Sequence, residues 1–263
     1  MLLNTIHETL KQGAETRVFV IGDVHGNPRI IEDAMESVGF NTEKDLMISV
    51  GDLVDVGPDS AQCLMYLRED WFVATRGNHE HLIKMYMDRN EDETLIDALK
   101  DNGAQWFLDL PFEQKEVVHA MVKRMPVALT VEMATGHKIG VVHADCPNDD
   151  WNVFLERLDE RHHKQLIDTL WTRNRYESKS EARVKNINAI VVGHNPIGVN
   201  KFNETLGNVV HIDTGRHFDD SRPLPIINLD WIEEQAGIEF GERLCEINEV
   251  PDFSFYAEPV VTC

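Results

Sequence analysis

The chain has 263 residues, 42% of them hydrophobic and 27% charged. This composition is close to that of soluble globular domains and excludes a chain that is disordered over most of its length. Acidic residues outnumber basic ones by 46 to 25, for a formal net charge of −21. Because such a charge repels polyanions, we expect no nucleic acid partner. No apolar run approaches the roughly 20 residues of a membrane-spanning helix, so we expect no membrane partner.

The N-terminal residues and the cysteines favour a cytoplasmic location. Residues 1–12 have neither the basic start nor the continuous apolar stretch of a signal peptide. The four cysteines lack a Cys-x-x-Cys spacing and are too few for a disulfide scaffold, as is typical of a reducing compartment. We therefore expect a cytoplasmic protein.

Strands and helices are predicted to alternate in the N-terminal third of the chain. Three runs of apolar, often β-branched residues each lead into a loop and then into a segment with apolar residues at helical spacing. The strands are predicted at 16–22, 46–51 and 71–77, and the helices at 28–38, 61–67 and 80–87. This alternation indicates an α/β fold.

The remainder of the chain is predicted to contain both helices and strands. Residues 93–125 are expected to form two helical pieces, interrupted by Gly103 and Pro111, without a chemical role. The later elements are a β-hairpin over 127–144, a helix over 152–171, and strands over 188–193, 208–214 and 224–229.

The domain organisation is predicted to be one domain over residues 1–230 with an acidic C-terminal extension over 231–263. Between Asp230 and Glu258 the chain holds nine acidic residues and one basic residue, Arg243. A solvated surface element packed on the same domain explains this composition more simply than a docking site for a basic partner.

Four predicted strands end in a glycine followed by a residue type that binds metal ions. The pairs are Gly22–Asp23, Gly51–Asp52, Gly77–Asn78 and Gly193–His194. In open α/β sheets, functional groups gather at the carboxyl ends of the strands, where glycine permits tight turns. We therefore expect these four side chains to form one site.

Two histidines are expected to join this site. His25 lies two residues after Asp23, so both side chains point to one side of an extended chain, and His143 ends a predicted strand. Imidazole and oxygen ligands without thiolate suit Mn²⁺, Fe or Zn²⁺. Because six ligands exceed what one catalytic ion takes, we expect a two-metal centre with one bridging carboxylate. Seven other histidines, His211 and His217 among them, are expected to be structural, while the role of His81, next to the site in sequence, stays open.

The motifs of the chain resemble those of the metallophosphoesterase superfamily. In order and spacing they are similar to the phosphoprotein phosphatase family, and most of all to the small phage lambda-type serine/threonine protein phosphatases. The similarity runs from about residue 16 to about residue 230. The matching motifs are GDVHGN (22–27), GDLVDVG (51–57), RGNHE (76–80), VHAD (142–145), WTR (171–173), VGHNP (192–196) and HIDTG (211–215).

The resemblance implies a calcineurin-like metallophosphoesterase fold, a two-sheet β-sandwich flanked by α-helices, with residues 1–230 as the metallophosphatase catalytic domain. It also assigns a role to each matching residue. Asp23, His25 and Asp52 would hold the first metal ion, and Asp52, Asn78, His143 and His194 the second. His79 would be the general acid, Asp55 would orient it, and Arg76 and Arg173, together with Asn78, would bind the substrate.

The implied activity is hydrolysis of phosphoserine and phosphothreonine, with phosphotyrosine as a further candidate. A water bridging two divalent ions, Mn²⁺ with Fe or Zn²⁺ as alternatives, would attack phosphorus, and His79 would protonate the leaving alkoxide. The partner would be a phosphoprotein or a small phosphoester. Two alternatives stay open: a nucleotide or dinucleoside polyphosphate hydrolase or phosphodiesterase, and a non-catalytic phosphoprotein-binding module.

One position departs from the family pattern GD-x-VDRG. Val56 stands where the family has an arginine, and valine provides none of the charge-assisted hydrogen bonds that arginine gives to phosphate. Arg216, just after the HIDTG motif, and Arg175 are the candidates to replace it. We expect weaker phosphate binding unless one of them does so.

Overall fold

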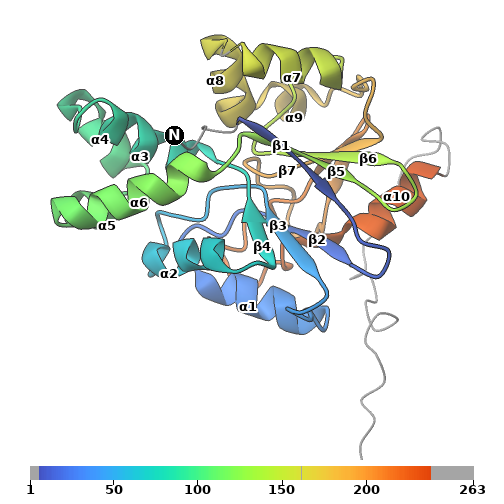
Figure 1. Cartoon of the computed structure of the whole chain (residues 1–263), viewed down its shortest axis with the longest axis horizontal. Coiled ribbons are helices and arrows are strands. Elements are labelled where there is room, and N and C mark those ends of the chain that lie inside the picture. The colour runs from blue at the N-terminus through green and yellow to red at the C-terminus, as the bar shows by residue number, and fades with distance from the viewer. Residues whose placement is uncertain (1–5, 161, 238–263) are drawn as a thin grey trace, which may run out of the picture.

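Two mixed β-sheets packed face to face form the centre of the molecule (Figure 1). The computed structural model describes residues 6–160 and 162–237. The larger sheet has, in spatial order, the strands β1 (His7–Lys11), β5 (Ala128–Glu132), β6 (Lys138–Val142), β7 (Ala189–Val192), β9 (Val209–His211) and β8 (Glu204–Leu206). The smaller sheet has the order β10 (Ile226–Asn228), β2 (Val18–Ile21), β3 (Leu46–Ser49) and β4 (Phe72–Ala74).

Parallel pairing places the carboxyl ends of the central strands of each sheet at the same edge of that sheet. In the smaller sheet β2, β3 and β4 are mutually parallel, and in the larger sheet β6, β7 and β9 are. Antiparallel partners lie toward the margins, where β10 pairs with β2, β5 with β6, and β8 with β9. The loops that follow the parallel strands therefore leave each sheet at the same edge.

Helices cover the outer face of each sheet (Figure 1). The smaller sheet carries α1 (Pro28–Ser37) and α2 (Ser60–Met65), and the larger sheet carries α7 (Trp151–Asp159), α8 (His163–Trp171) and α9 (Asn174–Ser178). A third group, which projects to one side, comprises α3 (Asn78–Asp88), α4 (Ile96–Asp101), α5 (Gln105–Leu108) and α6 (Phe112–Arg124). Two short 3₁₀ helices span Tyr66–Arg68 and Glu93–Leu95.

Side-chain alternation explains why β2 lies between two apolar layers. Val18 and Val20 point into the core between the sheets, whereas Phe19 and Ile21 point into the core beneath the helices of the smaller sheet. All four are fully buried. A strand that is buried on both faces has a continuous apolar sequence, as this one does.

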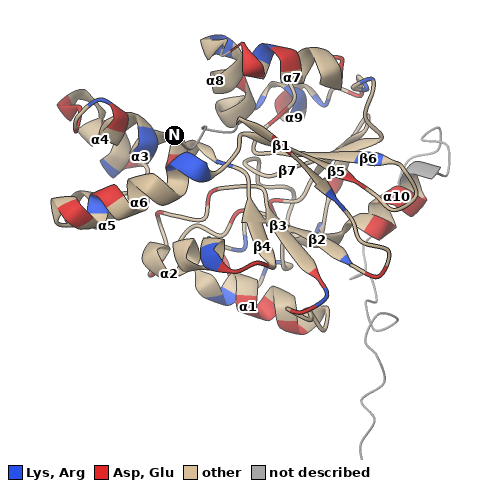
Figure 2. Ribbon diagram, viewed as in Figure 1, with Lys and Arg blue, Asp and Glu red and all other residues tan. Residues whose placement is uncertain are grey.

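Figure 2 shows the acidic residues spread over the outer helices, including α1, α4, α6, α7 and α10 (Leu229–Gly237), rather than gathered in one block. Since the excess of acidic residues faces solvent, the apolar interior can form in spite of the net charge of −21.

The predicted α/β fold is confirmed, as is the two-sheet sandwich implied by the resemblance. The predicted hairpin over 127–144 is the antiparallel pair β5–β6. Four strands and α-helices were not predicted, namely β1, β8, α9 and α10, and the single helix expected over 152–171 is two helices, α7 and α8. The strands β1 and β8 are short, polar edge strands, so they lack the apolar runs that identify buried strands.

Helix α10 crosses the predicted boundary at residue 230. Leu229 and Ile232 are buried in the core between the sheets, so the chain up to residue 237 packs on the same body. The rest of the predicted acidic extension lies outside the described residues. Within the described residues, no helix has the length and apolarity needed to cross a bilayer.

His211 is a buried histidine whose pKa is changed by the fold. It lies in β9, fully buried against the ring of Tyr176, and neither of its ring nitrogens has a hydrogen-bond partner among the described residues. Burial lowers the pKa of His211 to about 3. The unfolded chain, with an ordinary histidine pKa near 6.5, therefore takes up a proton that the folded chain does not as the pH falls from 6.5 toward 3.

We expect His211→Phe to reduce the loss of stability in acid. Between pH 7 and pH 5 the metal-free variant should lose about 2 kcal/mol less free energy of unfolding than the wild type. The reason is that position 211 then carries no imidazole that the unfolded chain could protonate. Urea denaturation at the two pH values measures this difference. Equal losses in both proteins would show that His211 does not contribute to acid sensitivity.

Candidate metal centre

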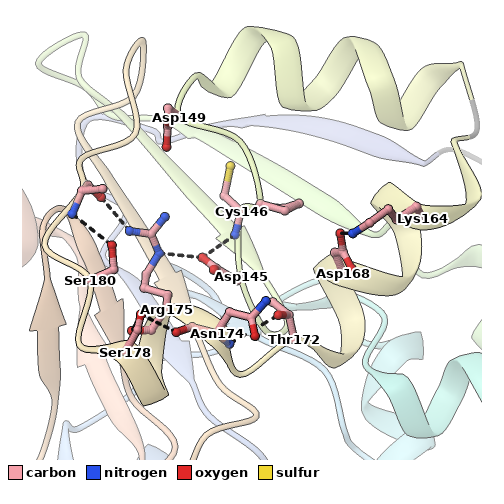
Figure 3. Close-up of a pocket in the computed structure, with 12 residues that line it drawn as sticks. Asp145, Cys146, Asp149, Lys164, Asp168, Thr172, Asn174, Arg175, Ser178 and Ser180 are labelled. Carbon is pink, nitrogen blue, oxygen red and sulfur yellow. Dashed lines mark hydrogen bonds and ion pairs between the residues drawn. The ribbon is translucent and has the colours of Figure 1, made fainter.

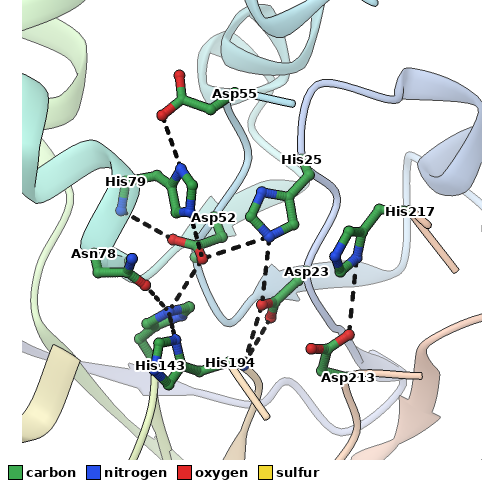
Figure 4. Close-up of polar contacts among 12 residues, drawn as sticks. Asp23, His25, Asp52, Asp55, Asn78, His79, His143, His194, Asp213 and His217 are labelled. Carbon is green, nitrogen blue, oxygen red and sulfur yellow. Dashed lines mark hydrogen bonds and ion pairs between the residues drawn. The ribbon is translucent and has the colours of Figure 1, made fainter. Parts of the chain in front are cut away.

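Five strands deliver the predicted metal ligands to one place (Figure 4). Each ligand lies in the loop that follows its strand or at the start of the next helix, and none is more than 7% exposed. The residues and the strands they follow are Asp23 and His25 after β2, Asp52 after β3, Asn78 after β4, His143 after β6, and His194 after β7. The structure thus brings these six side chains together at the strand ends.

Asp52 lies at the middle of the cluster. Its Oδ2 atom is 3.3 Å from Nε2 of His143, 3.7 Å from Nε2 of His25 and 3.8 Å from Nε2 of His79. Burial raises the pKa of Asp52, but these histidines lower it by more, so the pKa lies well below its usual range. The carboxylate is therefore ionised at neutral pH.

Two groups of side chains could each hold a metal ion, and Asp52 belongs to both. The first is His25, Asp52 and His79, and the second is Asp52, His143 and His194, with ligand atoms in each group within 4.8 Å of one another. Oδ1 of Asn78 lies 2.8 Å from Nε2 of His143 and so adds an oxygen to the second group. A carboxylate common to two sites is the arrangement of a two-metal centre.

Asp23 lies at the margin of the first group. Its Oδ2 is 3.9 Å from Nε2 of His25, and both of its carboxylate oxygens accept a hydrogen bond from the backbone N–H of His194 at 3.1 Å. The first group thus contains His79, which the resemblance assigned as an acid, in the place where Asp23 was expected.

The donor set fits divalent cations. Burial, Asp213 and Asp52 hold the pKa of Asp23 well above its usual range, because the buried carboxylates face one another. Burial and the adjacent His143 lower the pKa of His194 to about 3, which leaves its imidazole neutral and able to coordinate. Cations among neutral imidazoles and buried carboxylates would offset this concentration of negative charge.

The backbone is strained where it presents these ligands. His25, Asp52 and His194 have φ angles of 46°, 50° and 63°, in the left-handed region that non-glycine residues seldom occupy. Hydrogen bonds hold the loops in place, since the backbone N–H groups of Val24 and His25 both donate to the carbonyl of Asp52 at 3.1 and 2.8 Å. Strain of this kind is typical of functional sites.

Glu80 fixes the loop that carries Asp52. This fully buried carboxylate accepts hydrogen bonds from the backbone N–H groups of Asp52, Leu53 and Gly77 at 3.0, 2.7 and 2.8 Å, and from Val54 at 3.3 Å. Glu80 belongs to the RGNHE motif, but no role was predicted for it. The signal in the sequence is an acid at the third position of α3, three residues after the N-cap Gly77, where a capping carboxylate is expected.

Only glycine fits sterically at position 77, directly before Asn78. A Cβ atom on Gly77 would lie 2.1 Å from Oδ1 of Asp52, so any other residue would push the central carboxylate away. The same carboxylate oxygen accepts the backbone N–H of His79 at 3.2 Å. Gly77 therefore permits α3 to begin directly against Asp52.

His79 and Asp55 form a buried pair beside the cluster. Nδ1 of His79 lies 2.8 Å from Oδ2 of Asp55, while Nε2 faces Asp52 (Figure 4). Burial lowers the pKa of His79, but Asp52 and Asp55 raise it by more, to about 9. The structure thus brings together the two residues that the resemblance assigned as acid and orienting group.

Arg76, which the resemblance implied binds phosphoryl oxygens, also has a structural contact. Its Nε donates to the backbone carbonyl of Val122 at 3.1 Å, and its Nη2 donates to those of Lys123 and Met125 at 3.1 and 2.6 Å. These carbonyls end α6 and have no partner within the helix. Arg76 therefore caps α6.

Arg173 is the arginine that reaches the rim of the cluster. Its Nη1 donates to the carbonyl of His194 at 2.8 Å and to Oδ1 of Asn195 at 3.0 Å. The two candidates to replace the missing family arginine lie elsewhere. Arg216 donates to the carbonyl of Arg222, and Arg175 is paired with Asp145 at 2.8 Å.

A polar cavity of about 360 Å³ is lined by residues of the loop after β6 and by residues in and around α8 and α9, none of them a predicted metal ligand (Figure 3). The Arg175–Asp145 pair forms part of its wall, and Thr172 and Asn174, which flank Arg173 in the chain, form another part.

His217 was expected to be structural, but it lies against the cluster. Its ring centroid is 4.2 Å from that of His25, its side chain is 2% exposed, and its Nδ1 is 3.9 Å from Oδ1 of Asp213. Asp213 follows β9 closely, so the strand-end pattern could have identified it. No such pattern marks His217, which reaches the cluster through the turn after Asp213 (Figure 4).

Comparisons with known proteins agree with this geometry. A family model described as calcineurin-like phosphoesterase matches residues 16–246. The chain is 31% identical to serine/threonine-protein phosphatase 1 of Salmonella typhimurium, over 81% of this chain and 93% of that protein. It is 32% identical to the symmetrical bis(5'-nucleosyl)-tetraphosphatase of Aromatoleum aromaticum, over 40% of this chain and 42% of that protein.

Solved structures show the same fold at low sequence identity. A putative diadenosine tetraphosphatase matches with a TM-score of 0.52 and 18% identity, over 84% of this chain and 96% of that chain. A cold-active protein tyrosine phosphatase matches with a TM-score of 0.54 and 14% identity, over 84% and 75% of the two chains.

We expect Glu80→Gln to lower the free energy of unfolding of the metal-free protein by about 3 kcal/mol. An amide offers one acceptor oxygen where the carboxylate offers two, and it turns an NH₂ donor toward backbone N–H groups. Urea denaturation at pH 8, above the pKa of about 7 to which burial raises Glu80, measures the loss. Glu36→Gln on the exposed face of α1 is the control, and similar small effects in both variants would contradict the assignment.

Proposed function

Because the chain belongs to the calcineurin-like phosphoesterase family, we propose that it is a metal-dependent protein phosphatase that hydrolyses phosphoserine and phosphothreonine, with phosphotyrosine as a third substrate. The observation that carries this proposal is the buried His79–Asp55 pair beside Asp52. An alkoxide is a poor leaving group and needs a proton donor, and the pair provides one. The two curated serine/threonine-protein phosphatases matched over most of their length, at 93% and 87%, support the same proposal.

In this proposal the cluster binds two divalent metal ions, Mn²⁺ with Fe or Zn²⁺ as alternatives. Asp23, His25 and Asp52 would hold one ion, and Asp52 would share the other with Asn78, His143 and His194. When bound, such ions make a hydroxide nucleophile available near neutral pH and offset the negative charge of the transferring phosphoryl group.

His79 would hold the proton that the leaving oxygen needs. Asp55 accepts the Nδ1–H of the imidazole, so the second proton resides on Nε2, the atom that faces the cluster. Because Asp52 and Asp55 raise the pKa of His79 to about 9, the imidazolium is the main form at neutral pH. Proton transfer from Nε2 then accompanies cleavage of the bond between phosphorus and the leaving oxygen.

Arg173 and Asn78 would orient the substrate. Arg173 is fixed at the rim by the carbonyl of His194, and its charge lies next to the second ligand group. Arg76 donates to carbonyls at the end of α6 through Nε and Nη2, so only its Nη1 would take part in the phosphate binding that the resemblance implied.

A second candidate function is hydrolysis of a dinucleoside polyphosphate. Val56 favours it, because the valine side chain is 53% exposed at the position of the family arginine, and a phosphate diester or anhydride carries less charge to be bound at each phosphorus. The non-catalytic binding module explains less, because it needs neither His79 nor the Asp55 contact.

A direct comparison of substrates tests the proposal. We expect the Mn²⁺-loaded protein to show a higher kcat/KM on a phosphoserine peptide than on diadenosine tetraphosphate, and a chelator to abolish both activities. His79→Asn should lower kcat on the peptide by about 10²–10⁴-fold. A preference for the dinucleotide would replace the proposal with the second candidate, and a metal-loaded protein inactive on both would favour the binding module.

We expect Val56→Arg to raise kcat/KM on phosphomonoesters about 10-fold, since one charge-assisted hydrogen bond to phosphate is restored. The backbone at Val56 has a φ of 66°, which an unbranched Cβ tolerates better than valine does. Val117→Arg, on the exposed face of α6, adds the same charge away from the cluster and should leave kcat/KM unchanged. No gain in a folded, metal-loaded Val56→Arg protein would indicate a site shaped for another substrate.

A further inference from the structure

Trp106 contacts the His79–Asp55 pair from a segment that sequence analysis gave no chemical role. It lies in α5, in the helical group that projects beside the sandwich. Its indole Nε1 donates a hydrogen bond to Oδ1 of Asp55 at 2.7 Å, while Oδ2 of the same carboxylate is 2.8 Å from Nδ1 of His79. Both oxygens of the buried Asp55 carboxylate are therefore engaged, one by each ring.

We propose that Trp106 is a positioning residue that fixes the Asp55 carboxylate and, through it, the orientation of the His79 imidazole. The inference rests on the proposed function, in which His79 protonates the leaving oxygen. Trp106 touches neither substrate nor metal ligand in this account, and it acts only through Asp55.

The chemistry of the indole group suits this role. Its N–H is a donor only, so Trp106 can neither accept a proton from Asp55 nor compete with His79 for one. Its ring is held by packing against the core beneath the helices, including Phe107 at a centroid distance of 5.9 Å. A donor on a fixed ring restricts rotation of the carboxylate about its terminal torsion, which is otherwise broad.

The loop that carries Asp55 needs such support. Asp55 and Val56 have φ angles of 70° and 66°, so two consecutive non-glycine residues lie in the left-handed region. The backbone N–H of Asp55 is held by the Ser60 hydroxyl at 2.8 Å. That bond fixes the main chain and leaves the direction of the side chain to its own two contacts.

A second close approach brings the same segment onto the loop. Gly103, with a φ of 84°, lies so near Val56 that a Cβ atom on it would be 2.8 Å from the Val56 backbone nitrogen. Gly103 and Trp106 are three residues apart and contact consecutive residues of the loop. The α4–α5 segment therefore packs on the loop at two points, one steric and one polar.

The role predicts a dependence on the leaving group. When the bond between phosphorus and the leaving oxygen breaks, the electron pair goes to that oxygen, and the proton on Nε2 of His79 goes with it. An alkoxide requires this proton, whereas para-nitrophenolate leaves without it. Misorientation of His79 should therefore slow the hydrolysis of alkyl phosphates and leave aryl phosphates with good leaving groups unaffected.

Two substitutions at Trp106 distinguish the effect of its N–H donor from the effect of its aromatic ring. Trp106→Phe keeps the aromatic area and removes the N–H, whereas Trp106→His keeps an N–H at the corresponding place in a five-membered ring and loses area. We expect Trp106→Phe to lower kcat on a phosphoserine peptide about 10-fold, a part of the roughly 10²–10⁴-fold that general acid catalysis contributes. We expect less than about 2-fold change in KM, and less than about 2-fold change on para-nitrophenyl phosphate.

The pattern across variants decides the inference. Trp106→His should recover most of kcat on the peptide, and Trp71→Phe, in the aromatic cluster with Phe40 and Tyr66, should leave the ratio of the two activities unchanged. An equal loss on both substrates in Trp106→Phe would assign Trp106 a purely structural role and overturn the inference. Wild-type protein inactive on both esters would overturn the proposed function instead, and the inference with it.

A measurement that needs no turnover checks the contact itself. In an NMR spectrum of the metal-free protein, the indole N–H of Trp106 should shift on Asp55→Asn, since a carboxylate acceptor becomes an amide, while that of Trp71 stays in place. An unchanged Trp106 resonance would show that the hydrogen bond is not formed in solution and would overturn the inference.

Discussion

The ionised carboxylate of Asp52, buried at the junction of the two sheets, is the constraint on which the rest of the site depends. Its side chain faces three imidazoles, its carbonyl accepts the backbone N–H groups of the β2 loop, and its own N–H donates to Glu80. Burying one charge is costly unless many groups compensate it. The loops after β2, β3, β4 and β6 provide that compensation, so their positions are interdependent.

This constraint explains how a strongly acidic protein can act on phosphate, which is itself an anion. Acidic residues are spread over the outer helices, whereas the interior cluster combines buried carboxylates with imidazoles, a donor set suited to cations. At an ionic strength near 0.15 M, surface charges more than about 8 Å away are largely screened. In the proposed mechanism the local charge at the cluster, set by two divalent ions, Arg173 and His79, would outweigh the net charge in attracting substrate.

The sequence predicted the parts of the site that depend on strand ends and missed those that depend on side-chain direction. Asp23, Asp52, Asn78 and His194 each follow a glycine at the end of a buried strand, so local pattern alone indicated their convergence. Arg76 belongs to the same motif as Asn78, but its guanidinium turns toward the end of α6, which no local pattern reveals.

In the fold, too, local sequence patterns predicted some elements and missed others. Buried strands such as β2 were predicted from their apolar runs, whereas β1 and β8 pair only at the sheet margins and resemble loops in sequence. Trp106 is the extreme case, because it contacts Asp55 across 51 positions of chain. Neither residue has a neighbour in sequence that would indicate the contact, and only the packing of α4 and α5 on the loop creates it.

These facts separate two functions of the architecture. The predicted metal ligands follow the ends of the sandwich strands, whereas α5, outside the sandwich, contacts the Asp55 carboxylate that pairs with His79. In the proposed mechanism the nucleophile and the acid would therefore depend on different parts of the chain. Changes in the helices α4–α6 would then alter which leaving groups the site accepts without moving a metal ligand, while Gly77 and Glu80 keep the start of α3 against Asp52.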